Sequence, residues 1–133
     1  MLQILVIEDE SELRALLGEY FSRAGHRVTA VGSGREALEL LQSDLSRIDA
    51  AIIDWHLPGI SGRDVIASIR DRFPQLPIII TTGDLNERLR VGGSAENAVE
   101  LLFKPYSLRA LRSRVEALAA EAEAGRKPKI GES

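Results

Sequence analysis

Short apolar runs alternate along the chain with longer segments in which apolar residues recur at a helical period. Five runs have the length of β-strands and occupy residues 2–7, 27–31, 50–54, 77–83 and 99–103. The run that ends at Asp54 is apolar throughout, which is typical of a strand covered on both faces of a parallel sheet. The run at 27–31 is more polar, so we expect it near an edge of the sheet.

The segments between the runs predict helices with defined ends. Serines that can cap a helix begin four of them and are Ser11, Ser33, Ser61 and Ser107. Ser33 and Glu36 have the spacing of a capping box, Gly25 is expected to end the first helix in the left-handed conformation, and Pro74 to stop the third. In the first helix the apolar residues form one continuous stripe, made of Leu13, Leu16, Leu17, Tyr20, Phe21 and Ala24.

The remaining segment, residues 84–90, has helical character but little apolar periodicity. Gly92 and Gly93 follow it closely. We therefore expect the fourth helix to be the shortest and most mobile, and to be the element that becomes ordered when the protein changes state.

Five strands that alternate with five helices require right-handed crossovers and a parallel sheet with helices on both faces. The sequence of 133 residues has the length of one domain. We predict a doubly wound α/β domain over residues 1–123. Residues 124–133 mix Gly, Pro and Lys and are expected to form a flexible tail or the stub of a linker.

Composition excludes several classes of function. Seventeen basic and twenty acidic residues give a net charge of −3, so nucleic-acid binding within this chain is disfavoured. The absence of cysteine excludes a disulfide framework and a thiolate metal site. No apolar run is long enough to span a membrane and no signal peptide is apparent, so we expect a cytoplasmic protein without a membrane partner.

Polar side chains follow four of the predicted strands at their carboxyl ends. They are Glu8 and Asp9 after the first, Asp54 at the end of the third, Thr82 at the fourth and Lys104 after the fifth. Because ligands bind outside the carboxyl ends of parallel strands, these groups are expected to converge on one rim. Clustered carboxylates suit Mg²⁺, and a carboxylate nucleophile beside a metal, an ammonium and a hydroxyl can receive a phosphoryl group.

Four motifs in this order resemble the receiver domain of two-component response regulators, the family of the chemotaxis response regulator. They are Val6-Ile7-Glu8-Asp9, Asp54-Trp55-His56-Leu57-Pro58-Gly59, Thr82-Gly83 and Lys104-Pro105. The similarity covers residues 2 to about 122 and extends to receivers attached to hybrid sensor kinases. It implies a flavodoxin-like (βα)5 fold with a five-stranded parallel sheet in the order 2-1-3-4-5.

The resemblance also assigns a metal site. It implies that Asp9 and Asp54 bind Mg²⁺ directly, together with the main-chain carbonyl of His56, and that Glu8 acts mainly through water. The His56 imidazole is expected to be neither catalytic nor a ligand, although at the mouth of the site it could influence the access of water.

By the same resemblance, Asp54 accepts a phosphoryl group from a histidine kinase or a phosphotransfer protein. Thr82 is the switch hydroxyl, and Lys104 is the phosphate-binding amine, oriented by a cis bond to Pro105. The output is a change in binding to a downstream protein, and a homodimer is compatible with it. Such a domain is not an enzyme in the ordinary sense, although it can catalyse its own dephosphorylation.

One position departs from the family pattern. Many members carry an aromatic residue three positions before the lysine, which rotates inward on activation, but here that residue is Leu101. The usual rotamer switch is therefore in question. Phe103 lies on the same face of the predicted strand and could partly replace it.

Other readings of these residues stay open. Asp54 and Thr82 could be ordinary turn residues, Lys104 a solvated charge, and the acids at 8–9 could favour the first helix through its dipole. A magnesium-dependent phosphatase of the haloacid dehalogenase type also uses an aspartate nucleophile, but it needs a second aspartate where His56 stands. An interaction module without phosphorylation is the third alternative, against which the complete set of site residues argues.

Overall fold

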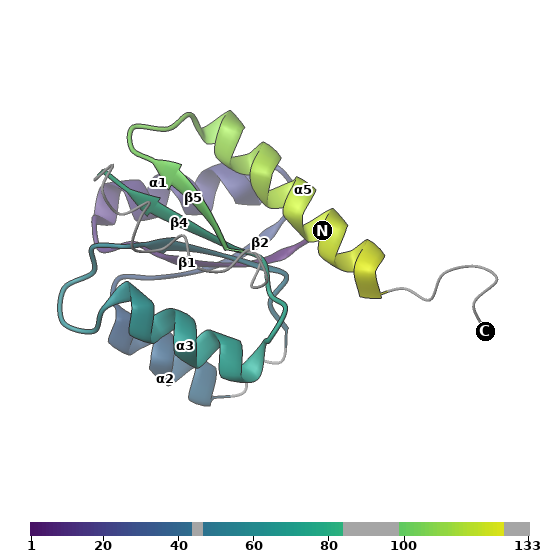
Figure 1. The fold of residues 1–133 in the computed structure, drawn as a ribbon. Coiled ribbons are helices and arrows are strands. Elements are labelled where there is room, and N and C mark those ends of the chain that lie inside the picture. Colours follow the sequence, from purple (N-terminus) through teal and green to yellow (C-terminus); the bar gives the residue numbers. More distant parts are fainter. Residues whose placement is uncertain (44–46, 84–98, 127–133) are drawn as a thin grey trace.

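The computed structural model describes residues 1–43, 47–83 and 99–126. The described elements, in chain order, are β1 (Gln3–Ile7), α1 (Ser11–Arg23), β2 (Arg27–Val31), α2 (Gly34–Gln42), β3 (Ala50–Asp54), α3 (Gly62–Arg72), β4 (Ile78–Thr82), β5 (Val99–Phe103) and α5 (Leu108–Arg126). Figure 1 shows their arrangement. The fourth helix expected at 84–90 lies outside the described residues, as do residues 127–133.

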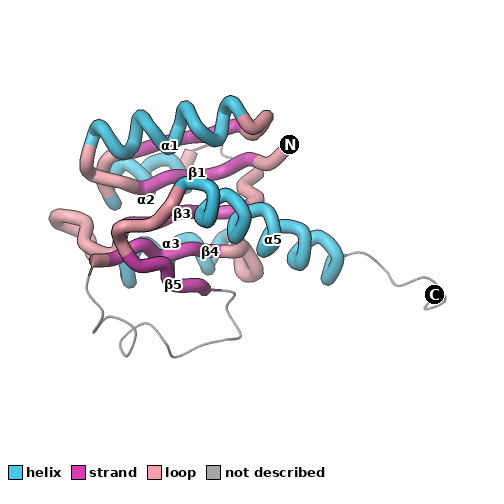
Figure 2. The backbone as a smooth tube through the Cα atoms, turned by 90° about the horizontal axis from the view of Figure 1, so that it is seen from above, coloured by secondary structure: helices cyan, strands magenta, loops and turns pink. Residues whose placement is uncertain are grey.

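All five strands pair in parallel in one sheet, in the order β2-β1-β3-β4-β5. This confirms the predicted doubly wound topology. Because the first crossover runs to one side of β1 and the later ones to the other, the carboxyl ends of β1 and β3 lie at the switch point of the sheet, where α/β proteins bind ligands. Figure 2 shows the strands from above, with β3 between β1 and β4.

Helices cover both faces of the sheet and create two apolar cores. Helices α2 and α3 pack on one face, and α1 and α5 on the other (Figure 1). Residues of one strand alternate between the cores: Leu5 and Ile7 of β1 face α2 and α3, whereas Ile4 and Val6 face α1 and α5. The central strands are therefore apolar without alternation because both of their faces are buried.

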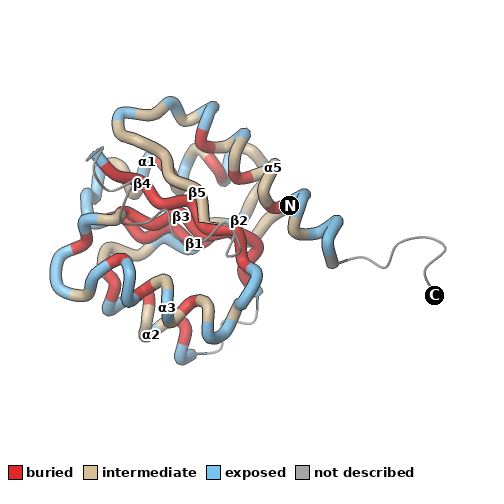
Figure 3. The backbone as a smooth tube through the Cα atoms, viewed as in Figure 1, coloured by how far each residue is buried: buried red, intermediate tan, exposed pale blue. Residues whose placement is uncertain are grey.

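Burial also explains why the strands differ in polarity. Every residue of β3 and β4 is buried, as Figure 3 shows in red. The edge strand β2, by contrast, is mostly exposed. Fully burying one isoleucine side chain stabilises a fold by about 1.5–3 kcal/mol, so these strands form a rigid support. Glu8, Asp54 and Thr82 are therefore carried at the ends of strongly buried strands, whereas Lys104 follows the partly buried edge strand β5.

Three of the four expected serine caps are confirmed. Their hydroxyl oxygens accept hydrogen bonds from backbone N–H groups three residues later, Ser33 from Glu36 at 3.1 Å, Ser61 from Asp64 at 3.2 Å and Ser107 from Ala110 at 2.9 Å. The Glu36 side chain also reaches back, but it accepts from the N–H of Gly32 at 3.1 Å, one residue before the Ser33 cap whose N–H a capping box uses. The helix before Pro74 ends at Arg72, as predicted.

Helix α1 differs from the prediction in two details. Glu10 occupies its N-cap position without a side-chain cap, and Ser11 is the first helical residue. Leu16, which the stripe placed in the core, is 47% exposed, whereas Leu17 and Phe21 are buried and Leu13 and Tyr20 pack partly against the same core. Gly25 has the predicted left-handed conformation, with φ of 93°.

Helix α5 is longer than the sequence indicated. It continues through Gly125 to Arg126, past the expected start of the tail at residue 124. The alanines and glutamates that precede Gly125 are strong helix formers, and one glycine costs only about 1 kcal/mol. In the described ranges, no helix has both the length and the apolar character needed to cross a membrane.

Candidate functional site

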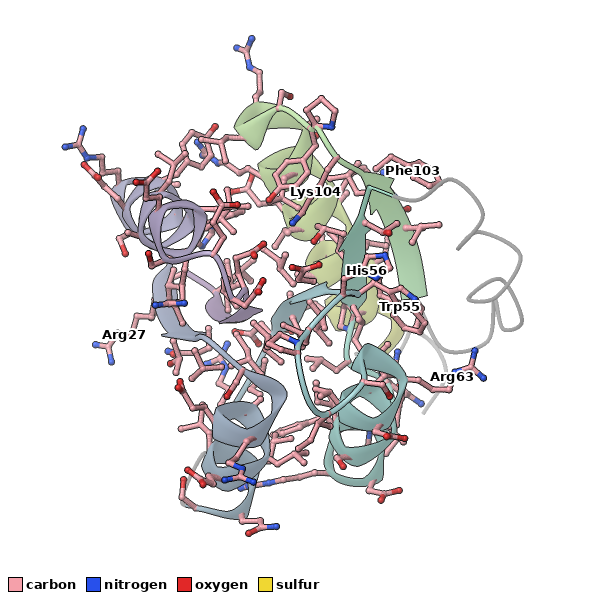
Figure 4. All side chains as sticks on the ribbon, turned by 90° about the vertical axis from the view of Figure 1, so that its left-hand side faces the viewer. Arg27, Trp55, His56, Arg63, Phe103 and Lys104 are labelled. Carbon is pink, nitrogen blue, oxygen red and sulfur yellow. The ribbon has the colours of Figure 1, made fainter. Side chains whose placement is uncertain are left out.

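The carboxyl ends of the strands bring an acidic cluster and an amine together. Glu8 and Asp9 follow β1, and Asp54 ends β3; one carboxylate oxygen from each lies within 4.8 Å of those of the other two. Lys104 follows β5 and reaches the same rim, seen in Figure 4. The predicted convergence is thus present in the structure, although the chemical role of each residue remains a prediction.

Glu8 is the most deeply placed carboxylate, with only 2% of its surface exposed. It accepts a hydrogen bond from the backbone N–H of Glu10 at 3.1 Å and one from Lys104 Nζ at 3.2 Å. Burial, reinforced by the negative charge of Asp54, raises its pKa above the ordinary value in spite of these two bonds. The surroundings of Glu8 therefore disfavour its ionised form.

Lys104 is the cation of the site. Its Nζ lies 3.2 Å from Glu8 Oε1 and 3.6 Å from Asp54 Oδ2. Burial by itself lowers the pKa of Lys104, but the charges of Asp54 and Glu8 outweigh this effect and raise it. Its backbone N–H donates to the carbonyl of Thr82 at 2.7 Å, and the bond to Pro105 is cis, as the resemblance implied.

Asp54 is held at the end of β3 by backbone contacts. Its side chain is buried, and Oδ1 accepts a hydrogen bond from the N–H of His56 at 3.1 Å. The next residue, Trp55, donates its N–H to the carbonyl of Thr81 at 2.9 Å. Since β3 is buried along its whole length, the carboxylate has a fixed position beside the amine.

Thr82 is the last residue of β4 and is fully buried. Its hydroxyl oxygen lies 3.1 Å from Nε2 of His56, within hydrogen-bond distance. His56 is an exposed residue of the loop after β3 and lies 26 residues before Thr82, so the sequence gave no indication of this contact. The structure thus places the expected switch hydroxyl against the side chain for which the sequence suggested no direct role in the site.

Arg14 belongs to the site, and sequence reasoning missed it. From α1 its Nη1 donates to the carbonyl of Glu8 at 2.9 Å and approaches the carbonyl of Asp9 at 3.5 Å. A side chain at Gly32 would place Cβ 2.8 Å from this nitrogen, so glycine leaves room for the guanidinium. A basic residue in the first turn of the expected helix carries no signal of its own.

Leu101 takes the position of the missing aromatic residue. It is partly buried and packs against the core that α2 and α3 cover. Phe103, labelled in Figure 4, ends β5 beside Thr82 and is also partly buried. Whether Phe103 replaces the usual aromatic switch stays a prediction.

The donor set fits a hard divalent cation. It consists of three carboxylates, of which Glu8 and Asp54 are buried and Asp9 is exposed, with one ammonium to balance them. A further cation would relieve the excess of negative charge, and oxygen ligands of this kind suit Mg²⁺.

Comparison with known proteins agrees with this geometry. The family model of the response regulator receiver domain matches residues 4–116. The two-component response regulator PhoP of Pseudomonas aeruginosa is 37% identical over 117 residues, which are 88% of this chain and 51% of PhoP. The transcriptional regulatory protein TcrA of Mycobacterium tuberculosis is 34% identical over 128 residues, 96% of this chain and 50% of TcrA. The chain spans about half the length of these curated relatives.

Solved structures show the same fold. A response regulator receiver domain protein from Clostridium thermocellum aligns with a TM-score of 0.83 at 27% identity, covering 93% of this chain and 98% of that one. The receiver domain of the Pseudomonas aeruginosa sensor histidine kinase PA1611, which holds a magnesium ion in its active-site cleft, aligns with a TM-score of 0.76 at 23% identity, covering 90% and 98%. The second likeness is evidence of fold alone.

Proposed function

Because the chain belongs to the family of response regulator receiver domains, and is a phosphoacceptor module of two-component signalling, we propose that Asp54 is its phosphoacceptor. The observation that carries this proposal is the place of Asp54, buried at the carboxyl end of β3 with the amine of Lys104 3.6 Å from its Oδ2. A carboxylate held beside a cation at the switch point of the sheet is positioned to act as a nucleophile.

The proposed reaction is an in-line displacement at phosphorus. A carboxylate oxygen of Asp54 forms the new O–P bond as the P–N bond of a donor phosphohistidine breaks, and the electron pair of that bond returns to the imidazole nitrogen. Little covalent chemistry is left to the protein, so positioning and electrostatic stabilisation supply most of the acceleration. The buried backbone around Asp54 provides the positioning.

Two residues are proposed to stabilise the transferred group. The Lys104 ammonium, already within reach of both Glu8 and Asp54, neutralises the oxygens of the phosphoryl group. The Thr82 hydroxyl donates a hydrogen bond to one of these oxygens and reports the modification to neighbouring elements. Because Leu101 stands where many members of the family carry an aromatic residue, this report does not use an aromatic rotation at that position, and Phe103 could partly replace it.

The same rim is proposed to hold Mg²⁺. Asp9 and Asp54 would bind it through carboxylate oxygens and His56 through its main-chain carbonyl, while Glu8 would hold a coordinating water. When bound, the ion supplies positive charge against the oxygens of the transferring phosphoryl group. Asp9→Ala should weaken the response of Trp55, the only tryptophan, to added Mg²⁺.

The partners follow from this chemistry. We propose a histidine kinase or phosphotransfer protein as the donor, a downstream protein or a further part of a longer chain as the receiver of the signal, and the cytoplasm as the place of action. The curated relatives that are twice as long include transcriptional regulators, so an effector domain in a longer protein is one form of that output.

Intact mass after treatment with a small phosphodonor and Mg²⁺ tests the proposal. Wild type should gain the mass of one phosphoryl group, and Asp54→Asn should gain none, because the amide is no nucleophile under these conditions. Asp71→Asn, a change at an exposed aspartate of α3, is the matched control and should behave as wild type. Undiminished modification of Asp54→Asn would overturn the assignment. Thr82→Ala should still accept the group and fail in signalling.

A further inference from the structure

His56 contacts the site through its backbone and its side chain at once. Its N–H donates to Asp54 Oδ1 at 3.1 Å, and its Nε2 lies 3.1 Å from Oγ1 of Thr82. The residue itself is exposed, whereas Asp54 and Thr82 are buried. His56 therefore touches both the group that is modified and the group that is expected to respond.

The loop that carries His56 is firmly attached to the domain. Trp55 donates its N–H to the carbonyl of Thr81 at 2.9 Å, and a Cβ added at Gly62 would lie 3.0 Å from Cε3 of the Trp55 ring. The indole and the start of α3 thus pack without room for a larger residue. In Figure 4 the side chains of Trp55 and His56 lie next to each other between β4 and α3. These contacts fix the backbone next to His56, and the imidazole itself contacts Thr82 through the hydrogen bond.

The chemistry of the threonine hydroxyl limits what it can do. A hydroxyl has one proton to donate, and the oxygens of a phosphoryl group only accept hydrogen bonds. If Thr82 donates that proton to His56, it must release the imidazole before it can bind a phosphoryl oxygen. The resting contact then opposes the phosphorylated arrangement by the free energy of one hydrogen bond.

We propose that His56 is a positioning residue that holds the Thr82 hydroxyl in the resting state, with Thr82 donating to Nε2, and that phosphorylation of Asp54 transfers this hydrogen bond from the imidazole to the phosphoryl group. The inference rests on the proposed function of Asp54 and Thr82 and adds a regulator of the same site. Because His56 acts through Thr82, it sets how much of the phosphorylated protein reaches the signalling arrangement.

The first experiment measures the resting contact without metal or phosphodonor. Urea unfolding of wild type, His56→Ala, Thr82→Val and the double variant forms a double-mutant cycle. His56→Ala should lower the urea midpoint more in the wild-type background than in the Thr82→Val background. Equal midpoint shifts in both backgrounds would show that the two side chains are not coupled and would overturn the proposal.

The second experiment measures competition with a phosphoryl mimic. Beryllofluoride is titrated in the presence of Mg²⁺ and followed by Trp55 fluorescence. His56→Ala should bind it about two- to tenfold more tightly, the factor expected for removal of one neutral hydrogen bond. His56→Gln should restore wild-type affinity, because its amide oxygen can accept from Thr82. In the Thr82→Val background His56→Ala should change the affinity less than it does in the wild-type background.

Controls separate this inference from the proposed function. Pro58→Ala, at an exposed residue of the same loop, should leave the beryllofluoride affinity unchanged. Unaltered binding of beryllofluoride by His56→Ala would overturn the proposal. Weaker binding would also overturn it, because it would mean that the imidazole donates to Thr82 and supports the modified state. Wild type that gains no mass from a phosphodonor would refute the phosphoacceptor role, while the urea cycle would still decide whether the resting contact exists.

Discussion

The Lys104 ammonium lies closer to Glu8 than to Asp54, 3.2 Å from Glu8 Oε1 against 3.6 Å from Asp54 Oδ2. In the resting state the amine therefore mainly balances the charge of Glu8, which is the most buried carboxylate of the cluster and is not the proposed nucleophile. When Asp54 carries a phosphoryl group, the amine has a second and more highly charged anion beside it. The predictions below follow from this division of charge and from the contacts around it.

Lys104→Ala should slow phosphoryl uptake by about 10²-fold without abolishing it, because the nucleophile and the metal ligands remain. It should also lower the free energy of unfolding at neutral pH by about 1–3 kcal/mol, since it removes a charged hydrogen bond to Glu8. Mass spectrometry over time and urea unfolding measure the two effects. Arg27→Ala, a change at an exposed residue of β2, is the control. Phosphoryl uptake by Lys104→Ala at the wild-type rate would contradict the proposed role of Lys104.

Glu8→Gln should raise the free energy of unfolding of the metal-free domain near neutral pH. Burial raises the pKa of Glu8 in the folded state, so folding favours its protonated form. Below the ordinary value of 4.5 the carboxyl group is protonated in both states and costs nothing. As pH rises through the folded-state pKa, the wild type loses that stability and the variant does not.

Urea unfolding at a series of pH values measures this difference, which should close as the solution is acidified. The same variant should bind Mg²⁺ more weakly at neutral pH, because it lacks one negative charge. A gap in stability that stayed constant with pH would show that the change acts through packing and not through ionisation.

Arg14→Met should weaken Mg²⁺ binding about tenfold, in the range found when groups that orient metal ligands are removed. The guanidinium fixes the backbone of Glu8 and Asp9, and methionine keeps the length of the side chain without its donors. Trp55 fluorescence measures the titration. Arg23→Met is the matched control, since Arg23 lies exposed on the same helix and pairs with Glu19 at 2.7 Å. Equal affinities in the two variants would exclude this role for Arg14.

Leu101→Ala should cost about 2 kcal/mol of unfolding free energy, because a partly buried leucine leaves the core covered by α2 and α3. Phosphoryl uptake should remain close to that of wild type, as nothing in the proposed reaction uses this side chain. Urea unfolding and intact mass give the two answers. Complete loss of uptake in a variant that still folds would restore a switching role to this position.

The order and type of the described elements, and the residues of the rim, followed from the sequence. Asp54 and Lys104 could be placed together because parallel strands deliver their carboxyl ends to one edge of a sheet, whatever the details of packing. Likewise, Ser33, Ser61 and Ser107 cap their helices through contacts only three residues long. Local rules and one topological rule were enough for these features.

Other features were decided by the tertiary structure. The apolar stripe of α1 does not reveal that Leu16 stays exposed, since that depends on how the helix is rotated against the sheet and α5. The sequence also does not reveal that Arg14 reaches the carbonyl of Glu8. Nor does it reveal that His56 contacts Thr82, which lies 26 residues further along the chain. Such contacts arise only where separate elements pack at a particular distance and angle. The burial that raises the pKa of Glu8 likewise exists only once the strands and helices around it have assembled.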